Sequence, residues 1–268
     1  MTGSSTGGDP VLTPLNLLLV SISLPDEPAV EPEPEPAVVI DPSPLPSIYD
    51  YLSFDSTLAL TDIRGTSITD QVASGGGNSN SITTDSKLGA GALQADGEAR
   101  LEFPSSWADF RGQSFLIWGW AKHPTSGAGT DLIRKNSNTN ATIFVLRRQP
   151  SNSTKLRLIV GFSDGSSVFS DTTTDPSFDE YFFFAFTWDR VNKTVELWIN
   201  GQSQFQINVP TGTDLAAPGP ITYIHDLNTN GPSYRNLDEV GLSATAGSQE
   251  IIDFLYNDGA GRTLSEIT

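Results

Sequence analysis

The feature that most constrains the fold is a series of short β-prone runs separated by turn residues, which begins near Tyr49. The clearest runs are residues 114–122, 141–148, 155–162, 181–189, 193–201 and 203–209. They are rich in β-branched and aromatic residues, and the turn signals "DGSS", "DRVNK" and "NG" lie between them, which is typical of strands joined by hairpins. This pattern predicts an all-β fold built as a two-sheet antiparallel sandwich.

Side-chain alternation within the runs indicates which face of each strand is buried. In "TVELWIN", Val195, Leu197 and Ile199 share one face, whereas Glu196 and Trp198 share the other. The first face is apolar and predicts contact with a core, because successive side chains of a strand point to opposite sides. We expect the mixed second face to meet water or a ligand.

Helical spacing of apolar residues occurs clearly in one segment, residues 248–259. Its apolar positions recur every three or four residues, and Gly259 is a natural place for the helix to end. The chain of 268 residues is long enough for one large all-β domain. We therefore expect residues 49–268 to form a single sandwich domain.

Residues 1–48 differ in composition from the rest of the chain. They hold ten of the 18 prolines and seven acidic residues, with no Lys or Arg. The repeat "EPEPEP" at residues 31–36 favours polyproline II, which rises about 3 Å per residue. The sequence predicts an extended Pro/Glu-rich N-terminal arm whose Glu-Pro repeat acts as a short spacer.

Two apolar, β-prone segments flank this spacer, "LLLVSISL" before it and "AVVI" after it. They pack on the chain's own domain, add as strands to the sheet edge of a partner, or stay disordered. We expect the second arrangement, in which the arm anchors the protein. The predicted anchoring residues are Leu17, Leu18, Leu19, Val20, Ile22, Val38, Val39 and Ile40.

Composition excludes several classes of function. The formal net charge of −17 disfavours nucleic acid and anionic membrane surfaces as partners. The absence of cysteine excludes disulfides and thiolate catalysis, and two histidines, His123 and His225, are too few for a multi-histidine metal site. The apolar run at residues 15–24 is too short to span a bilayer, and no basic residue precedes Arg64 to mark a signal peptide.

Several motifs carry a family resemblance. "EYFFFAFTWDRVNKTVELWINGQSQ" resembles the characteristic hairpin of laminin-G-like, concanavalin A-like jelly rolls. "KLGAGALQADGEARLEF" is similar to an early strand pair of that family, "SFLIWGWAK" to its next long strand, and "NLDEVGLSATAGSQEIIDFLYNDG" to its closing strand and short helix. The matches follow the family order across residues 50–261. The resemblance implies a jelly-roll sandwich.

The resemblance also implies one structural calcium ion. Carried onto this chain, its ligands would be Asp55, the Gly97 carbonyl and Asp238. Carboxylate and carbonyl oxygens suit calcium. The alternative is that Asp238 caps a turn and Asp55 is solvated.

The same family contains both lectins and glycosidases, so the fold does not decide the function. The Glu-x-Asp-x-x-Glu arrangement of the hydrolases is missing, and we do not expect an enzyme. Glycan binding would need an aromatic platform with polar neighbours, and the candidates are Trp198, Trp120, Arg148 and Arg157. The alternative is that both tryptophans pack against other parts of the fold.

The ending "FLYNDGAGRTL" resembles laminin-G-like domains of tailed-phage virion proteins. This resemblance implies a non-enzymatic virion structural protein: a capsid decoration or a head- or tail-attached fibre, assembled in the host cytoplasm and exposed on the particle. Its expected partners are capsid or tail proteins and cell-surface glycans. A homo-oligomer is compatible with this role, although no heptad repeat supports one. The alternative is a carbohydrate-binding module of a bacterial surface or secreted protein.

Overall fold

The computed structural model divides the chain into two units, Met1–Asp41 and Pro42–Thr268. The structure describes residues 48–55, 69–71, 80–95, 100–104, 106–123, 131–137, 142–149, 154–177, 179–210, 212–224 and 235–268. The predicted arm and its anchoring residues therefore lie outside the described residues, apart from Ile48. The domain boundary at residue 48 and the anchoring role remain predictions.

One sheet of the sandwich has eight strands in the order β13-β12-β11-β6-β15-β4-β3, with β1 paired to β15. Its strands are β1 (Asp50–Leu52), β3 (Asn80–Thr83), β4 (Ala92–Ala95), β6 (Phe115–Lys122), β11 (Phe182–Asp189), β12 (Thr194–Ile199), β13 (Gln202–Asn208) and β15 (Arg235–Ser243).

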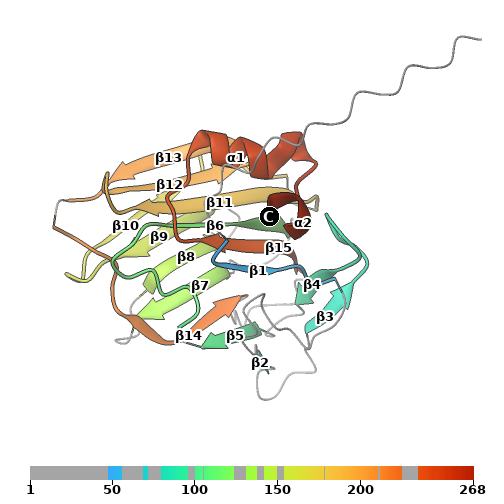
Figure 1. The fold of residues 1–268 in the computed structure, drawn as a ribbon, viewed down its shortest axis with the longest axis horizontal. Helices are drawn as coiled ribbons and strands as arrows, with labels where there is room; N and C mark the ends of the chain where they lie inside the picture. Colours follow the sequence, from blue (N-terminus) through green and yellow to red (C-terminus); the bar gives the residue numbers. More distant parts are fainter. Residues whose placement is uncertain are drawn as a thin grey trace, which may run out of the picture. The chain divides into compact units, whose positions relative to one another are not determined.

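The other sheet has seven strands in the order β10-β9-β8-β7-β14-β5-β2. Its strands are β2 (Thr69–Gln71), β5 (Arg100–Pro104), β7 (Asp131–Ser137), β8 (Thr142–Arg148), β9 (Leu156–Gly161), β10 (Ser167–Asp171) and β14 (Pro218–Ile224). Neighbouring strands in this sheet are antiparallel. Figure 1 shows the two sheets as stacked layers, which confirms the all-β, two-sheet antiparallel sandwich.

The six clearest β-prone runs all form strands, and the predicted turns lie between them. Asn200 and Gly201, with φ of 49° and 74°, make the tight turn from β12 to β13. Both take the left-handed backbone that this kind of hairpin requires, and Asn and Gly adopt it most readily. The segment that resembles an early strand pair of the family forms β4 and β5. These two strands do not pair with each other, because they belong to opposite sheets.

The core lies between the sheets and is rich in aromatic rings. Phe115 packs against Phe144 and Phe186 with ring centres 5.6 and 6.0 Å apart. The predicted inward residues of β12 (Val195, Leu197 and Ile199) are all buried in this core. These three positions confirm the alternation predicted for β12.

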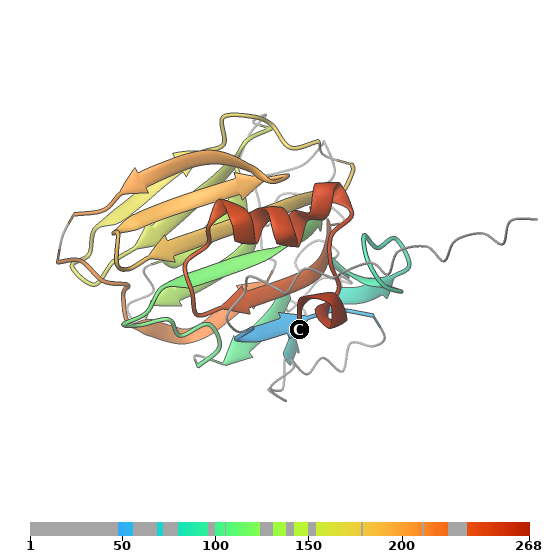
Figure 2. The same cartoon turned by 45° about the horizontal axis from the view of Figure 1, so that its top comes forward.

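The outer face of the eight-stranded sheet is covered by the C-terminal helices, α1 (Gln249–Tyr256), the 3₁₀ turn η1 (Asn257–Gly259) and α2 (Leu264–Ile267). Figure 2 shows α1 lying across this sheet. Ile252 and Leu255 of α1 pack in a second apolar cluster with Trp118, Trp120 and Trp198. The expectation that the second face of β12 meets water or a ligand is therefore wrong at Trp198, whereas Glu196 on the same face is partly exposed.

The predicted helix forms, but it ends earlier than expected. Ser248 caps its start by accepting a hydrogen bond from the Ile251 amide. Asn257, in the left-handed conformation, ends α1 before Gly259 is reached.

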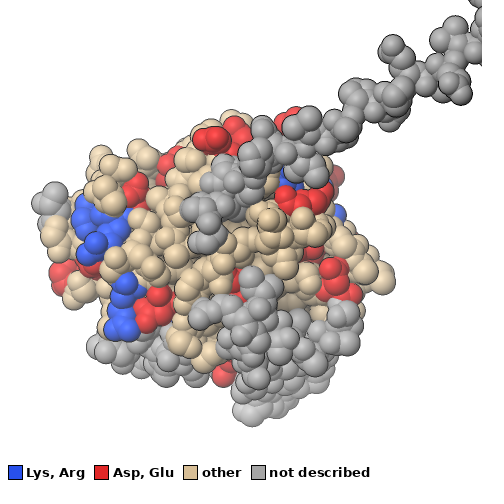
Figure 3. Space-filling model, viewed as in Figure 1, with Lys and Arg blue, Asp and Glu red and all other residues tan. Residues whose placement is uncertain are grey.

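On the side viewed in Figure 3, most of the described surface is uncharged. Among the described residues, no helix has the length and apolar character to cross a membrane.

Candidate functional site

The two tryptophans predicted as a glycan platform lie beneath α1. Trp198 is 1% exposed and Trp120 is 3% exposed. The ring of Tyr256 stacks on Trp120 at a centroid distance of 6.0 Å. Because α1 supplies this cover, neither ring offers a face to a sugar, and the open platform predicted on them must be corrected to a buried cluster.

The two arginines predicted beside them lie in the other sheet and differ from each other. Arg148 is buried, and its Nη1 lies 3.3 Å from Nδ1 of His123. Arg157 is partly exposed on the outer face of β9. The four predicted glycan-binding residues are therefore not brought together.

The predicted calcium ligands Asp55 and Asp238 do converge on one loop, although they are far apart in sequence. Asp238 Oδ2 accepts hydrogen bonds from the Lys87 and Leu88 amides at 2.8 and 2.9 Å. Asp55 Oδ1 accepts one from the Ala90 amide at 2.6 Å.

Both carboxylates thus accept hydrogen bonds from backbone amides of this loop. This arrangement resembles the alternative in which Asp238 caps a turn. The described residues contain no group of three or more His, Cys, Asp or Glu placed to hold a metal. Gly97, the third predicted ligand, lies outside the described residues. The predicted calcium site is therefore neither confirmed nor contradicted, and the ion remains a prediction.

Beside this loop, Asp238 and Glu239 are both buried. Burial raises the pKa of Asp238 to about 7 and that of Glu239 to about 8, because water no longer solvates the charged forms. The side chain of Tyr51 hydrogen-bonds to Glu239 and favours its charged form. Within the described part of the chain, Asp238 Oδ1 and Glu239 Oε2 have no hydrogen-bond partner. We assign these two acids no catalytic role.

The outer face of β8, β9 and β10 carries a different group of side chains. We call it the β8–β10 face and define it by Arg147, Arg157, Ile159, Phe169 and Asp171. The strand register places Phe169 opposite Ile159, Asp171 opposite Arg157, and Arg157 opposite Arg147. Five side chains from three strands thus point to one side of the seven-stranded sheet.

Phe169 is the aromatic centre of this face. Its side chain is 59% exposed, and Val191 is the one other large apolar side chain that is exposed among the described residues. The Arg157 guanidinium lies 5.0 Å from the centre of the Phe169 ring. This contact supports the ring from one side and helps to fix its position.

Arg157 is itself held by Asp171 in a two-point ion pair. Arg157 Nε lies 2.7 Å from Asp171 Oδ1, and its Nη2 lies 2.9 Å from Oδ2. Gln149 Nε2 also donates to Asp171 Oδ1 at 2.9 Å. The ion pair lowers the pKa of Asp171 and raises that of Arg157.

Arg147 is bound less completely. Its Nε lies 3.4 Å from Asp131 Oδ1, and its side chain is 29% exposed. This Nε makes no hydrogen bond within the described residues. Asp131 also pairs with Arg134 at 2.9 Å, so one carboxylate serves two guanidinium groups.

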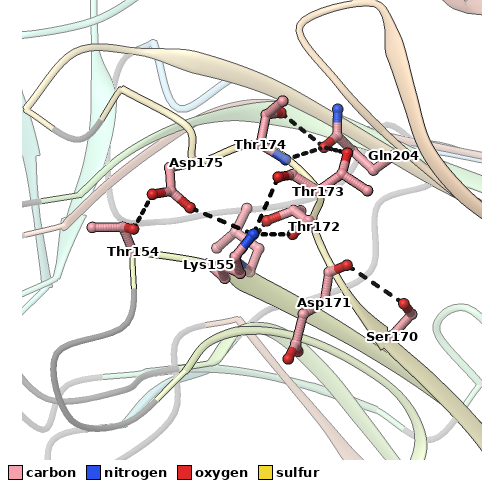
Figure 4. Close-up of polar contacts among 10 residues, drawn as sticks. Thr154, Lys155, Ser170, Asp171, Thr172, Thr173, Thr174, Asp175 and Gln204 are labelled. Carbon is pink, nitrogen blue, oxygen red and sulfur yellow. Dashed lines mark hydrogen bonds and ion pairs between the residues drawn. The ribbon is translucent and has the colours of Figure 1, made fainter.

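A polar network fixes the chain at the end of this face, as Figure 4 shows. Lys155 Nζ donates to the carbonyl oxygens of Thr172 and Thr173 at 2.8 and 3.1 Å. Gln204 of β13 accepts hydrogen bonds from Thr173 Oγ1 and from both the amide and the hydroxyl of Thr174. These contacts tie the segment that follows β10 to both sheets and position the border of the β8–β10 face.

Sequence reasoning identified Arg157 but missed Phe169 and Arg147. Phe169 lies in "SVFSD", a short run in which three of five residues are polar, so its strand character was weak. The usable signal was alternation, because Val168 packs inward while Phe169 points outward.

Neither a family model nor a curated relative matches the chain. The laminin-G-like assignment made from the motifs therefore remains a resemblance. Comparison with solved structures gives clear fold matches.

Three of these matches are binding domains of toxins. The binding domain of botulinum neurotoxin serotype G aligns with a TM-score of 0.61 and 13% identity over 78% of this chain and 50% of that chain. The serotype D ligand-binding domain, solved with N-acetylneuraminic acid, gives 0.61 and 13% over 79% and 50%. The binding domain of Paraclostridial Mosquitocidal Protein 1 gives 0.62 and 14% over 79% and 52%.

This chain thus matches about half the length of those binding domains. At these identities the likeness establishes a shared β-sandwich fold. It supports the fold predicted from the sequence and leaves the ligand to be argued from the side chains.

Proposed function

We propose that the sandwich domain is a non-enzymatic carbohydrate-binding module and that the β8–β10 face contacts the sugar. The observation that carries this proposal is Phe169, an exposed ring backed by the fixed Arg157–Asp171 pair. Sugar-binding sites combine an apolar ring, against which the C–H face of a sugar packs, with a few oriented polar groups for its hydroxyls.

The structural comparisons support the same class of function. One fold match is a toxin ligand-binding domain in complex with N-acetylneuraminic acid. A sandwich of this fold therefore occurs in proteins that bind sugars. The cover that α1 gives to Trp120 and Trp198 also favours the β8–β10 face, because it removes the alternative aromatic surface.

A glycan array probed with the full-length chain tests this function. We expect retention on at least one class of oligosaccharide, with the bound sugar recovered unchanged in length. Absence of binding to every printed glycan would contradict the proposal, and so would shortening of a bound oligosaccharide.

We further propose that the N-terminal arm attaches the module to a larger assembly, and that this assembly is a phage capsid or tail. The support is the Pro/Glu-rich composition of residues 1–48 and the resemblance of the chain's ending to virion proteins. The alternative is attachment to a bacterial surface or a secreted protein.

Limited proteolysis of the isolated full-length chain, read by mass spectrometry, tests the anchoring role. We expect rapid loss of the first 48 residues and a resistant remainder. Protection of those residues in the isolated chain would mean that they pack on their own domain or on a second copy, which would contradict anchoring to a partner.

A further inference from the structure

We propose that the β8–β10 face selects acidic saccharides, with Arg147 binding the sugar carboxylate while Phe169 packs against the ring. This inference rests on the proposed carbohydrate-binding function and specifies its ligand class. It is argued from the charges of this face and from the register of its strands.

This face carries more cations relative to acids than the chain as a whole. The whole chain has 15 Lys and Arg against 32 Asp and Glu. The surface formed by β7 to β10, with its turns and border, carries four cations, Arg134, Arg147, Lys155 and Arg157, and four acids, Asp131, Asp164, Asp171 and Asp175. This local balance repels an anionic ligand less than the rest of the acidic chain does.

The register places two arginines directly opposite each other. Arg147 of β8 pairs with Arg157 of β9. Like charges at directly opposed positions destabilise a sheet, since their Cβ atoms lie only about 5 Å apart. An anion bound between or above them would remove this repulsion.

The two arginines are not equally available to a ligand. Asp171 occupies Nε and Nη2 of Arg157. Among the described residues, Arg147 makes one ion pair, at 3.4 Å, to a carboxylate that it shares with Arg134. Arg147 is therefore the guanidinium that can offer a two-point contact to a carboxylate, which is the geometry that arginine favours.

The remaining groups suit the uncharged part of a sugar. Phe169 lies on β10, diagonal to Arg157 of the neighbouring strand β9. Arg147 lies on β8, on the other side of β9. A pyranose that packs on its exposed ring could extend across β9 toward Arg147. Asp171 and Gln149, already oriented by their mutual hydrogen bond, lie beside that path and can accept from and donate to sugar hydroxyls.

Matched probes and variants test the proposal in the full-length chain. Binding of sialyllactose and trigalacturonate is compared by calorimetry with that of lactose and maltotriose, which lack the carboxylate. We expect at least one acidic probe to bind about tenfold more tightly than its uncharged counterpart, a preference typical of a charge-assisted contact. This preference should weaken as salt is added.

Arg147→Gln should remove most of the preference for the acidic probe. Arg190→Gln is the matched control. Arg190 lies in the β11–β12 turn, outside this face, and pairs with Asp214. Phe169→Ala should weaken binding of every probe about tenfold, whereas Val191→Ala, at the other exposed large apolar residue, should not. Unchanged thermal unfolding of each variant shows that it is folded.

The outcomes separate the two proposals. Equal or tighter binding of the uncharged probes would overturn the selectivity while leaving carbohydrate binding intact. Equal effects of Arg147→Gln and Arg190→Gln would also overturn it. Failure of all four probes and of the whole glycan array would overturn the proposed function itself.

Discussion

At the scale of single residues, Lys135 is an unusual feature of the core. It is 1% exposed, and its ammonium group donates to the Trp107 carbonyl oxygen. Burial lowers its pKa from 10.5 to about 8, because the interior disfavours the charged form. The folded state thus binds a proton less readily here than the unfolded chain does.

This lowered pKa predicts a specific pH dependence of stability. Between pH 8 and pH 10.5 the unfolded chain holds more protons on Lys135, so this residue makes the free energy of unfolding rise with pH. Its contribution between pH 8 and pH 10 is about 2 kcal/mol. Urea unfolding of the wild type and of Lys135→Met at both pH values checks it. Equal pH slopes in the two proteins would contradict the prediction.

Also at the residue scale, the ion pair on the β8–β10 face predicts an effect on ligand choice. Asp171→Asn removes the acidic partner of Arg157 and leaves that guanidinium free for a ligand. The affinity ratio of sialyllactose to lactose should therefore rise about threefold, the scale of a partly exposed ion pair. Calorimetric titration of the variant measures this ratio, and a falling ratio would contradict the assignment.

At the scale of elements, the contact between α1 and the eight-stranded sheet buries the two tryptophans. Leu255 of α1 is 2% exposed and packs in the cluster that contains Trp120 and Trp198. Leu255→Ala should lower the free energy of unfolding by about 3 kcal/mol, because it leaves a cavity under the helix. It should also shift tryptophan fluorescence to longer wavelength.

Glu250→Ala is the control on the same helix, since Glu250 is exposed. Chemical denaturation followed by fluorescence measures both variants. Equal stability of Leu255→Ala and Glu250→Ala would mean that α1 does not seal this face, and the tryptophans would again be candidates for ligand binding.

The β12–β13 turn gives a second test of the same contact. A methyl group on Gly201 would lie 2.7 Å from Cδ1 of Tyr256 in α1, and its φ is 74°. Gly165 also has positive φ, at 84°, but a methyl group there meets nothing within 4 Å. Gly201→Ala should therefore cost about 2 kcal/mol more than Gly165→Ala, since only the first adds a clash to the backbone strain. Equal losses in thermal unfolding would contradict this placement of α1.

At the scale of the whole molecule, local patterns predicted the fold well. Alternation in "TVELWIN" identified the inward face of β12, and "NG" identified the turn that follows it, because both signals lie within a few neighbouring residues. The spacing of apolar residues also revealed α1. What such patterns could not show is where α1 docks, since that contact joins residues far apart in the sequence, such as Trp120 and Tyr256.

The same reasoning explains the errors at the site. Trp198 lies opposite the core face of β12, which predicts an open ring, because the helix that covers it cannot be seen from β12 alone. Phe169 and Arg147 were missed because their significance depends on the register of three strands. By contrast, Asp55 and Asp238 meet on one loop as the family resemblance implied, although their oxygens hold backbone amides.

The most direct test of the central claim is an NMR titration of the full-length chain with sialyllactose and trigalacturonate, with assigned amide and phenylalanine ring signals. The account predicts that the signals that move belong to β8, β9 and β10, with the Phe169 ring among the largest shifts. Shifts confined to α1 and the tryptophan cluster, or to the loop held by Asp55 and Asp238, would place the site elsewhere and contradict the claim.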